Sequence, residues 1–426
     1  MGFESEEPPN KKVKTDVCIF VNPKNKKQCK SLKSTQSKEF CTNHILYYKK
    51  LEGQKKHNNY EKIDAKFGKR IPCPLDGNHS CWEKELDKHL NKCTKGKMKS
   101  INDNEPWFEI DTNKGKTHAS LNNVSEEMII KSLKVIRNLK FDDIEEEILK
   151  DEVIQLERVA NLVGGQLKHA TQQSSLVSHM KTLLHSLKDS EKYSFCEFGC
   201  GRAELSRYSA LSISKSFRAP NKVVLIDRGN NRMKFDKNIR EESPETIVER
   251  YKCDIKDVNL KLMLKNSSSG KILAISKHLC GVATDLTLRC LKTTSNENKA
   301  AVIAMCCRHV CNSQDYINPS FIEEILSASE HKEDLTFEQF FKCITKISSY
   351  ATCGTRENEE GQIFEEGKHF TNLNTKEREE MGFVARRIID EGRLKWCKNN
   401  WSEKSKLVKY CDLTTTLENT ALIVPF

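Results

Sequence analysis

Between residues 190 and 310 the chain alternates short apolar runs with amphipathic stretches of helical length. Five runs have the length and composition of buried strands: YSFCEFG (193–199), KVVLID (222–227), TIVERYKCDI (246–255), KILAISKHL (271–279) and AAVIAMCC (300–307). Strands that alternate with helices build a doubly wound parallel sheet, which binds ligands beyond the carboxyl ends of its strands. We therefore predict an α/β domain with a Rossmann-like fold over residues 191–426.

A helical pattern precedes this domain. In residues 125–160, SEEMIIKSLKVIRNLKFDDIEEEILKDEVIQLERVA, apolar residues recur at spacings of three and four behind acidic starts. This predicts two helices within a helical segment of residues 125–190. Residues 98–124 are polar and broken by Gly and Pro, and we interpret them as a linker with Trp107 and Phe108 as an anchoring pair.

The composition of the chain indicates neither a membrane-spanning nor a secreted protein. Mean hydropathy is −0.64, and no apolar run approaches the roughly 18 residues that a membrane span requires. The N-terminal MGFESEEPPNKKVKTD lacks the apolar region of a secretory signal, so we expect an intracellular protein, in the nucleus, the cytoplasm or both, with no membrane partner. Its 18 cysteines are then thiols or metal ligands rather than disulfides. We assume a monomer.

The positive charge is concentrated at the N-terminal end. Residues 1–100 contain 23 Lys and Arg against 12 Asp and Glu, whereas residues 101–426 contain 48 of each. A local excess of this kind is typical of proteins that bind a polyanion. The alternative is a solvated basic segment, in part a nuclear import signal at KKVK, and we expect residues 1–14 to be a disordered basic tail.

Within this basic region, IPCPLDGNHSCWEKELDKHLNKC has the spacing of a zinc finger. We predict a module of residues 68–97 with the ligands Cys73, His79, His89 and Cys93. The last two ligands lie four residues apart in a helical pattern and so share one helix face. The first ligand, Cys73, stands between two prolines, and the second ligand, His79, directly follows the turn signal DGN. Cys81 competes, but it falls at the helix start and makes the ligand number odd.

A second metal-binding pattern precedes the first. The segment CIFVNPKNKKQCKSLKSTQSKEFCTNH ends in a compact C-x-x-H pair, and the stretch before the pair is too polar to form a core without metal. We predict a CCCH zinc finger over residues 15–50 with the ligands Cys18, Cys29, Cys41 and His44. Because every coordination place is filled, both modules are expected to bind or position a macromolecule rather than to catalyse.

The first strand of the predicted sheet ends in EFGCGRAELS. Two glycines allow a tight strand-to-helix turn, but Glu204 occupies the place of a third, which disfavours dinucleotide binding. Acidic residues in this order favour S-adenosylmethionine instead, since an acid after the second strand can bind ribose hydroxyls and one after the third the adenine amino group. The candidate cofactor residues are Glu197, Gly199, Gly201, Asp227 and Asp254. Each acid taken alone is more often a helix cap.

The fourth strand runs into SKHLCGVATDLTLRC, which contains candidate catalytic residues. We hypothesise that His278 or Asp285 assists deprotonation of an acceptor and that Lys277 holds a phosphate or stabilises an oxyanion. The structural alternative is that the Asp caps a helix and the His only packs. The fifth strand ends in AMCCRHVC (304–311), where a metal site is disfavoured because adjacent cysteines chelate one ion poorly.

These segments resemble a known family. The two fingers, KHATQQSSL, EFGCGRAELS, SKHLCGVATDL, a Cys-Cys strand end, IIDEGR and TLENTALIVPF follow one another as in the tRNA 2′-O-methyltransferase family that modifies nucleotide 4 of the acceptor stem. The resemblance covers nearly the whole chain. It implies methyl transfer from S-adenosylmethionine to a ribose 2′-hydroxyl in a subset of tRNAs. The second finger alone is also similar to one in a minor-spliceosome protein.

The chain departs from this family at two places. The family's Cys-Cys-His-His-Arg-Cys is replaced by Cys-Cys-Arg-His-Val-Cys, with Arg308 and Val310 at the changed positions, and a family Trp is replaced by Tyr350. We therefore assign no essential proton transfer to the segment 306–311.

Other functions remain open. One is a zinc-finger RNA-binding protein on an inactive methyltransferase fold, and another is a methyltransferase for another RNA, a protein or DNA. Against amino methylation, SKHL stands where an N-P-P-Y or D-P-P-Y tetrapeptide would end the fourth strand. An acceptor stem is an A-form duplex end that is recognised by shape and backbone. We expect the basic zinc modules to contact it.

Overall fold

The chain forms two compact units, Met1–Lys97 and Met98–Phe426. The computed structural model describes residues 17–20, 28–29, 31, 33, 39–41, 44, 63–64, 68–93, 96, 101–115, 118–229, 231–232, 234–264, 270–294, 298–352 and 369–426. The basic tail expected at residues 1–14 lies outside the described residues. No helix within these ranges combines the length and the apolar character that a bilayer span needs.

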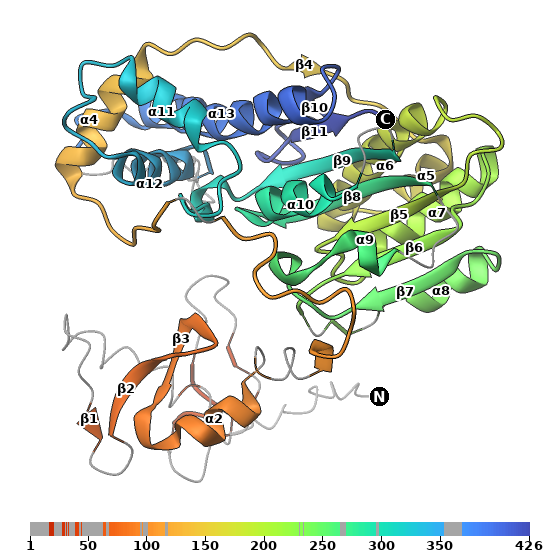
Figure 1. Cartoon of the computed structure of the whole chain (residues 1–426), viewed down its shortest axis with the longest axis horizontal. Helices are drawn as coiled ribbons and strands as arrows, with labels where there is room; N and C mark the ends of the chain where they lie inside the picture. The colour runs from red at the N-terminus through yellow and green to blue at the C-terminus, as the bar shows by residue number, and fades with distance from the viewer. Residues whose placement is uncertain are drawn as a thin grey trace, which may run out of the picture. The chain divides into compact units, whose positions relative to one another are not determined.

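The smaller unit contains an antiparallel sheet in the order β1-β2-β3, followed by a helix (Figure 1). Its elements are β1 (Ile63–Asp64), β2 (Gly68–Cys73), β3 (Asp76–Trp82), the 3-10 turn η1 (Glu83–Glu85) and α2 (Leu86–Lys92). The helix predicted in WEKELDKHLNKC is present, with a 3-10 first turn. The hairpin of β2 and β3 and the helix α2 thus bring the beginning and the end of this segment together.

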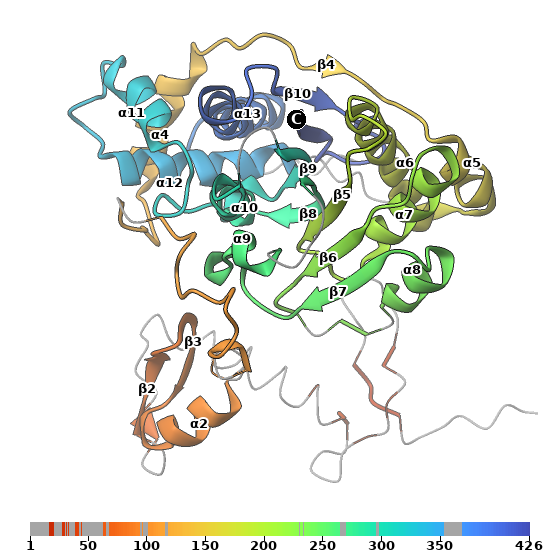
Figure 2. The same cartoon turned by 45° about the vertical axis from the view of Figure 1, so that its right-hand side comes forward.

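The larger unit is built on an eight-stranded sheet in the order β4-β10-β11-β9-β8-β5-β6-β7 (Figure 2). Its strands are β4 (Glu145–Glu146), β5 (Tyr193–Phe198), β6 (Lys222–Ile226), β7 (Ile247–Tyr251), β8 (Lys271–Cys280), β9 (Lys299–Cys306), β10 (Lys406–Lys409) and β11 (Thr420–Val424). The five strands from β5 to β9 are those predicted from the sequence, and they are parallel. Their order reverses between β5 and β8, so the ligand-binding switch point lies beside the end of β5. The α/β fold is confirmed.

Three strands were not predicted, and they make the sheet mixed rather than purely parallel. β11 inserts between β9 and β10 and is antiparallel to both. β4 adds a short parallel edge to β10. β10 and β4 escaped prediction because they have only four and two residues and carry several Lys and Glu.

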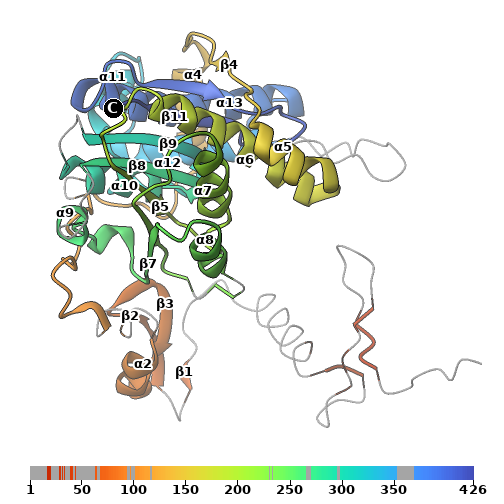
Figure 3. The same ribbon diagram turned by 90° about the vertical axis from the view of Figure 1, so that its right-hand side faces the viewer.

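Helices cover both faces of the sheet (Figure 3). Buried side chains of α5 (Glu152–Glu157), α6 (Gly164–Leu184), α7 (Glu204–Ser216) and α8 (Asp236–Glu242) form one hydrophobic cluster with the strands. Those of α9 (Leu260–Met263), α10 (Ala283–Lys292) and the second half of α13 (Thr375–Asn400) form another on the opposite face. The result is the three-layer arrangement that a doubly wound sheet requires.

A third hydrophobic cluster is made by helices and the loops next to them, without a strand. It joins α4 (Glu126–Arg137), α11 (Pro319–Ser327), α12 (Phe337–Ser348) and the first half of α13. α12 begins with a capping box between Thr336 and Gln339. Since α13 contributes to this cluster and to the sheet, it ties the two together (Figure 1).

The two segments ahead of the sheet differ from expectation. Residues 101–115, interpreted as a linker, pack against the larger unit: Trp107 is 5% exposed and meets Tyr251 edge to face at 5.2 Å, and Phe108 forms a β-bridge with Val258. The anchoring role of this aromatic pair is confirmed. The two predicted helices are present as α4 and α5, but the chain between them is extended and forms β4.

Candidate active site and metal centres

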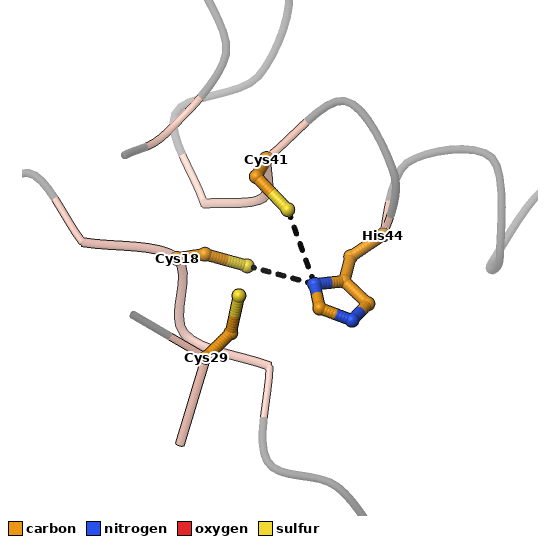
Figure 4. Close-up of side chains that lie close together, drawn as sticks. All are labelled: Cys18, Cys29, Cys41 and His44. Carbon is orange, nitrogen blue, oxygen red and sulfur yellow. Dashed lines mark hydrogen bonds between the residues drawn. The ribbon is translucent and has the colours of Figure 1, made fainter. Parts of the chain in front are cut away.

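Four side chains of the smaller unit meet at one point although they come from separate stretches of chain. The Sγ atoms of Cys18, Cys29 and Cys41 and a ring nitrogen of His44 all lie within 4.8 Å of one another. The His44 Nδ1 atom is 3.4 Å from Cys18 Sγ and 3.2 Å from Cys41 Sγ (Figure 4). Ligands at about 2.0–2.3 Å from a tetrahedral zinc ion are roughly 3.6 Å apart, so these four residues fit the predicted ion.

The described backbone around these ligands contains local supports. His44 N–H donates to Cys41 O at 3.0 Å, and Cys29 N–H donates to Phe20 O at 2.8 Å. The Phe20 ring stacks on the His44 ring with 3.8 Å between centroids. Because the sequence between these ligands is polar and rich in Lys, the module is expected to derive most of its folding energy from the metal.

The second group joins the end of β2 to α2. The His89 Nε2 atom is 3.1 Å from Cys73 Sγ, and the Sγ atoms of Cys73 and Cys93 are 3.9 Å apart. Cys93 N–H donates to His89 O at 2.6 Å, which places both residues one helical turn apart as predicted. The side chain of the fourth predicted ligand, His79 in β3, lies outside the described residues. Cys81 is buried in the same strand and does not join the group.

The turn after β5 has the open geometry that the glycines predict. Gly199 and Gly201 adopt φ values of 65° and 50°, in the left-handed region that glycine favours. A Cβ atom on Gly201 would meet nothing within 4 Å, whereas one on Gly199 would lie 3.3 Å from Leu279 Cδ1. The backbone of this turn therefore leaves room for a ligand at the carboxyl end of β5.

Asp227, directly after β6, contacts this turn. Its Oδ2 accepts the N–H of Gly201 at 2.7 Å, and its Oδ1 accepts the N–H of Gly229 at 2.6 Å. A carboxylate has about four lone-pair sites, so two further hydrogen bonds can be accepted. The turn is also held by Arg250 of β7, which donates to Gly201 O at 2.9 Å and pairs with Asp236 at 2.6 Å. No local sequence pattern marks this arginine as a site residue.

The other two predicted acids already serve the protein backbone. Glu197 is 4% exposed, and its Oε2 accepts from the hydroxyl and the N–H of Ser206 in the first turn of α7, at 2.5 and 3.2 Å. Burial raises the pKa of Glu197 to about 7. Asp254 accepts the N–H of Lys256 and caps the 3-10 turn that follows. Asp227 is thus the acid best placed to meet a cofactor.

Lys277, near the end of β8, is buried next to two imidazoles. Its Nζ atom is 2.7 Å from His169 Nδ1 and 3.3 Å from His278 Nε2, and only 8% of the residue is exposed. Among the described residues no carboxylate lies within ion-pair distance of it. Burial lowers the pKa of Lys277 to about 8. An amine with this pKa is a neutral base for a useful fraction of the time near pH 7.

Both imidazoles favour a neutral form. Desolvation, and next to it the charge of Lys277, lower the pKa of His169 and of His278. His169 comes from α6, in KHATQQSSL, and lies 108 residues before Lys277. His169 was not predicted to be a site residue, because no local sequence feature marks a contact over such a separation.

A cavity of about 240 Å³ opens beside this cluster. It is lined by residues of α6 between 165 and 172, the end of β8 with Lys277 and His278, Cys306 at the end of β9, and residues of the loop 410–418. These elements surround the carboxyl ends of β8 and β9, where doubly wound sheets carry their sites. The cavity therefore contains two of the three residues predicted to be catalytic.

Side chains near the cavity fix α6 against α7. Arg158 donates to the Gln173 side chain and pairs with Glu204 at 2.5 Å, and Gln173 donates to Glu204 at 3.3 Å. Glu204 is the first residue of α7, next to the glycine turn. The helix that carries His169 is thereby placed relative to the turn that would hold the cofactor.

Asp285 does not belong to this site. It is 0% exposed, and its carboxylate accepts two hydrogen bonds from Arg393 of α13, at 2.5 and 3.2 Å, and one from the N–H of Ile317, at 3.1 Å. The structure does not bring Asp285 together with Lys277 and His278, because SKHLCGVATDL turns from β8 into α10 and places this residue on the buried face of the helix.

The Asp285 pair is part of a larger buried network of charges. Its six members are Arg308, Arg386, Arg393, Asp285, Asp390 and Glu418. Arg308 pairs with Asp390 at 2.6 Å and with Glu418, which also pairs with Arg386. Three positive and three negative side chains cancel, as burial requires. The network joins the segments after β8 and β9 to IIDEGR and to the segment before β11. Arg308 thus has a structural role, because both of its ion pairs lie within the network.

A larger cavity, of about 570 Å³, lies elsewhere in the larger unit. Its lining includes His118, Arg289, Lys292 and Trp396. Arg289 and Lys292 are at the end of α10, which starts after the carboxyl end of β8 and runs back toward the amino ends of the strands. None of the predicted site residues lines it.

Comparison with known proteins identifies the family. The family model described as Methyltransferase TRM13 matches residues 171–425. This range begins within α6, two residues after His169, and includes the glycine turn, Lys277 and the buried network of charges. The chain belongs to the TRM13 methyltransferase family. A second model, the U11-48K-like CHHC zinc finger, matches residues 70–94. Its ligand order agrees with that predicted for the module with Cys73 and Cys93.

Curated members of the TRM13 family match along almost their whole length. The chain is 38% identical to "tRNA:m(4)X modification enzyme TRM13" of Vanderwaltozyma polyspora, over 97% of this chain and 99% of the relative. It is 36% identical to the enzyme of that name from Saccharomyces cerevisiae, over 96% and 95%, and 34% identical to that from Schizosaccharomyces pombe, over 83% and 95%. The matches therefore extend over the N-terminal segments with the predicted zinc modules as well as over the sheet domain.

Proposed function

We propose that this protein transfers a methyl group from S-adenosylmethionine to the ribose 2′-hydroxyl of nucleotide 4 in the acceptor stem of a subset of tRNAs. The names of the TRM13 relatives support tRNA as the substrate. The observation that carries the chemistry is the buried Lys277, whose pKa is lowered to about 8, at a cavity next to the glycine turn. A ribose hydroxyl that receives a methyl group must lose its proton to a base, whereas the sulfonium methyl group of S-adenosylmethionine is already a good electrophile.

The turn after β5 and Asp227 fit the cofactor. Gly199 and Gly201 keep side chains away from the end of β5, and Asp227 retains the capacity to accept two hydrogen bonds from ribose hydroxyls. S-adenosylmethionine supplies an electrophilic methyl group when it is bound. Asp254 stays a candidate for the adenine amino group only through lone pairs that its capping bond leaves available.

The cluster around Lys277 would handle the proton. In its neutral form the Lys277 amine accepts the proton of the ribose hydroxyl as the oxygen takes the methyl group, and the neutral rings of His169 and His278 orient the amine. The sequence had suggested His278 as the base and Lys277 as a positive charge. Lys277 is proposed as the base instead, because its pKa of about 8 makes it a stronger base than His278, whose pKa is lowered to about 4. Most of the acceleration is expected to come from alignment of the oxygen with the methyl group.

Labelled S-adenosylmethionine and total tRNA test the function directly. We expect the purified, zinc-loaded protein to place the label on a 2′-O-methylated nucleotide at acceptor-stem position 4, as mapped by nuclease digestion. Cofactor binding without label on tRNA would redirect the search to another RNA or protein acceptor. Absence of cofactor binding would favour an RNA-binding protein on an inactive fold.

Asp227→Ala is expected to weaken S-adenosylmethionine binding by about 10–150-fold, because hydrogen bonds to a charged group contribute about 1.5–3 kcal/mol. Isothermal titration of the full chain measures the dissociation constant. Asp189→Asn, at a side chain that is fully exposed, is the matched control and should leave the constant unchanged. An Asp227→Ala protein with wild-type affinity would place the cofactor elsewhere.

Deletion of residues 1–97, the smaller unit, is expected to raise the KM for tRNA at least about tenfold and to leave the turnover number nearly unchanged. The deleted region carries the basic excess of the chain, and each lost phosphate contact reduces the salt dependence of binding by about 0.9 in log–log slope. Methylation assays between 50 and 200 mM salt measure both effects. An unaltered KM would assign the zinc modules to another partner.

A further inference from the structure

Three cysteines of the larger unit meet at the carboxyl ends of β8 and β9. The Sγ atoms of Cys280, Cys306 and Cys307 all lie within 4.8 Å of one another, and those of Cys280 and Cys306 are 3.3 Å apart. Cys280 and Cys306 are register partners in the parallel pair of strands. Residues 26 positions apart in the sequence thus present their thiols at the same place.

The backbone explains how two adjacent cysteines can face one ion. Adjacent cysteines such as Cys306 and Cys307 were expected to chelate one ion poorly, and successive side chains along a strand also point to opposite faces of the sheet. Cys307, however, adopts a left-handed backbone conformation, with φ 51° and ψ 48°, directly after the end of β9. This turn ends the alternation and brings both thiols to the side of Cys280.

We propose that Cys280, Cys306 and Cys307 bind a zinc ion, as a third metal site in addition to the two N-terminal modules. Thiolates are preferred zinc ligands, and each thiol would release its proton to solvent on binding. Three protein ligands leave the fourth position open to water or another ligand, as in zinc sites that are not purely structural. This proposal does not depend on the methyl transfer proposed above.

The surroundings of the cluster support a metal site. Cys280 is exposed, which gives an ion a path of entry, and Cys306 lines the cavity beside Lys277. The N–H of Cys307 donates to Glu418 Oε1 at 3.1 Å, and Glu418 is fixed in turn by Arg308 and Arg386. Supporting contacts of this kind orient metal ligands.

A disulfide between Cys280 and Cys306 is the competing use of these thiols. It would need the sulfurs to approach to about 2.05 Å, and it would leave Cys307 without a purpose in the cluster. Three thiols whose Sγ atoms all lie within 4.8 Å of one another are better accounted for by an ion than by a bond between two of them. The test below separates the two.

Metal analysis of the full chain decides the proposal. Protein purified with a reductant and zinc, then passed through metal-free buffer, is expected to hold three zinc ions per chain by inductively coupled plasma mass spectrometry. Cys280→Ser should hold two, with an unchanged circular dichroism spectrum, because this side chain is exposed at a strand end. Cys307→Ser is a second variant with the same expectation. Cys343→Ser, at a buried thiol of α12 outside every cysteine group described, should keep three.

Each remaining result overturns the zinc assignment. Equal zinc content in the wild type, Cys280→Ser and Cys307→Ser would exclude the site. A Cys280–Cys306 disulfide in a non-reduced peptide map of freshly purified protein would assign the thiols to redox chemistry. A copper content that falls in Cys280→Ser while zinc stays constant would assign a monovalent thiophilic ion instead.

Discussion

Replacement of Lys277 by Met is expected to lower the turnover number for methyl transfer by about 10²–10⁴-fold, the range typical of a lost general base. The amine of Lys277 is buried, close to two neutral imidazoles and free of a carboxylate partner among the described residues. Methionine keeps the length and apolar stem of the side chain and removes the amine. S-adenosylmethionine affinity should therefore stay within about threefold, since the proposed cofactor site consists of the glycine turn and Asp227 and does not include Lys277.

The pH profile separates a base from a fixed positive charge. The pKa of Lys277 is lowered to about 8 by burial, and only the neutral amine can accept a proton. Turnover of the wild type should therefore rise roughly tenfold per pH unit below pH 8 and level off above it. Single-turnover rates between pH 6 and 9.5 measure this profile, and the Met variant should lack the rise.

Two further variants serve as controls. Lys277→Arg retains the charge but cannot lose its proton near neutral pH, so it should be as inactive as the Met variant. Activity within tenfold of wild type in Lys277→Arg would instead support a phosphate-binding or oxyanion-stabilising role. Lys168→Met changes an exposed lysine at the same cavity and should leave the shape of the pH profile unaltered.

Asp285→Ala is expected to destabilise the larger unit by about 3–5 kcal/mol, the cost of leaving one partner of a buried ion pair without its counter-charge. Asp285 and Arg393 are both 0% exposed, and the guanidinium also donates to Gly281 O at 3.0 Å. Loss of the carboxylate leaves Arg393 charged in a region from which water is excluded. Urea unfolding followed by tryptophan fluorescence should show the midpoint shift.

The double variant tests whether the effect belongs to the pair. Asp285→Leu combined with Arg393→Met removes both charges and should regain a large part of the lost stability. Lys237→Met is the matched control, because Lys237 and Glu241 form an exposed ion pair that contributes at most about 1 kcal/mol. Loss of turnover in Asp285→Ala with an unchanged urea midpoint would instead support the catalytic role predicted from the sequence.

The part of the fold that local patterns encode could be predicted. β5 to β9 are apolar runs of strand length between helices, and all five are present in parallel register. β11 belongs to TLENTALIVPF, yet its place in the sheet depends on pairing with β9 more than 110 residues earlier. Nor does a polar stretch such as 101–115 reveal that Trp107 lies in a hydrophobic cluster of the sheet. Tertiary pairing decides both.

The candidate site shows the same division. Close spacing predicted His89 and Cys93 on one helix face, and the glycines predicted the turn after β5. The place of Asp285 could not be predicted, because a carboxylate near a strand end has the same local sequence pattern whether it faces a cavity or a buried arginine 108 residues away. His169 and Cys280 were missed for the related reason that each acquires its chemical neighbours from another strand or helix.

The insertion of β11 between β9 and β10 also has a consequence for synthesis on the ribosome. β9 ends at Cys306 and β11 begins at Thr420, so one edge of β9 has no partner while residues 307–419 are translated. At about 5–20 residues per second this interval lasts roughly 6–23 s. A strand with an unpaired edge is a template for aggregation. The nascent chain is therefore expected to depend on chaperones until the sheet can close.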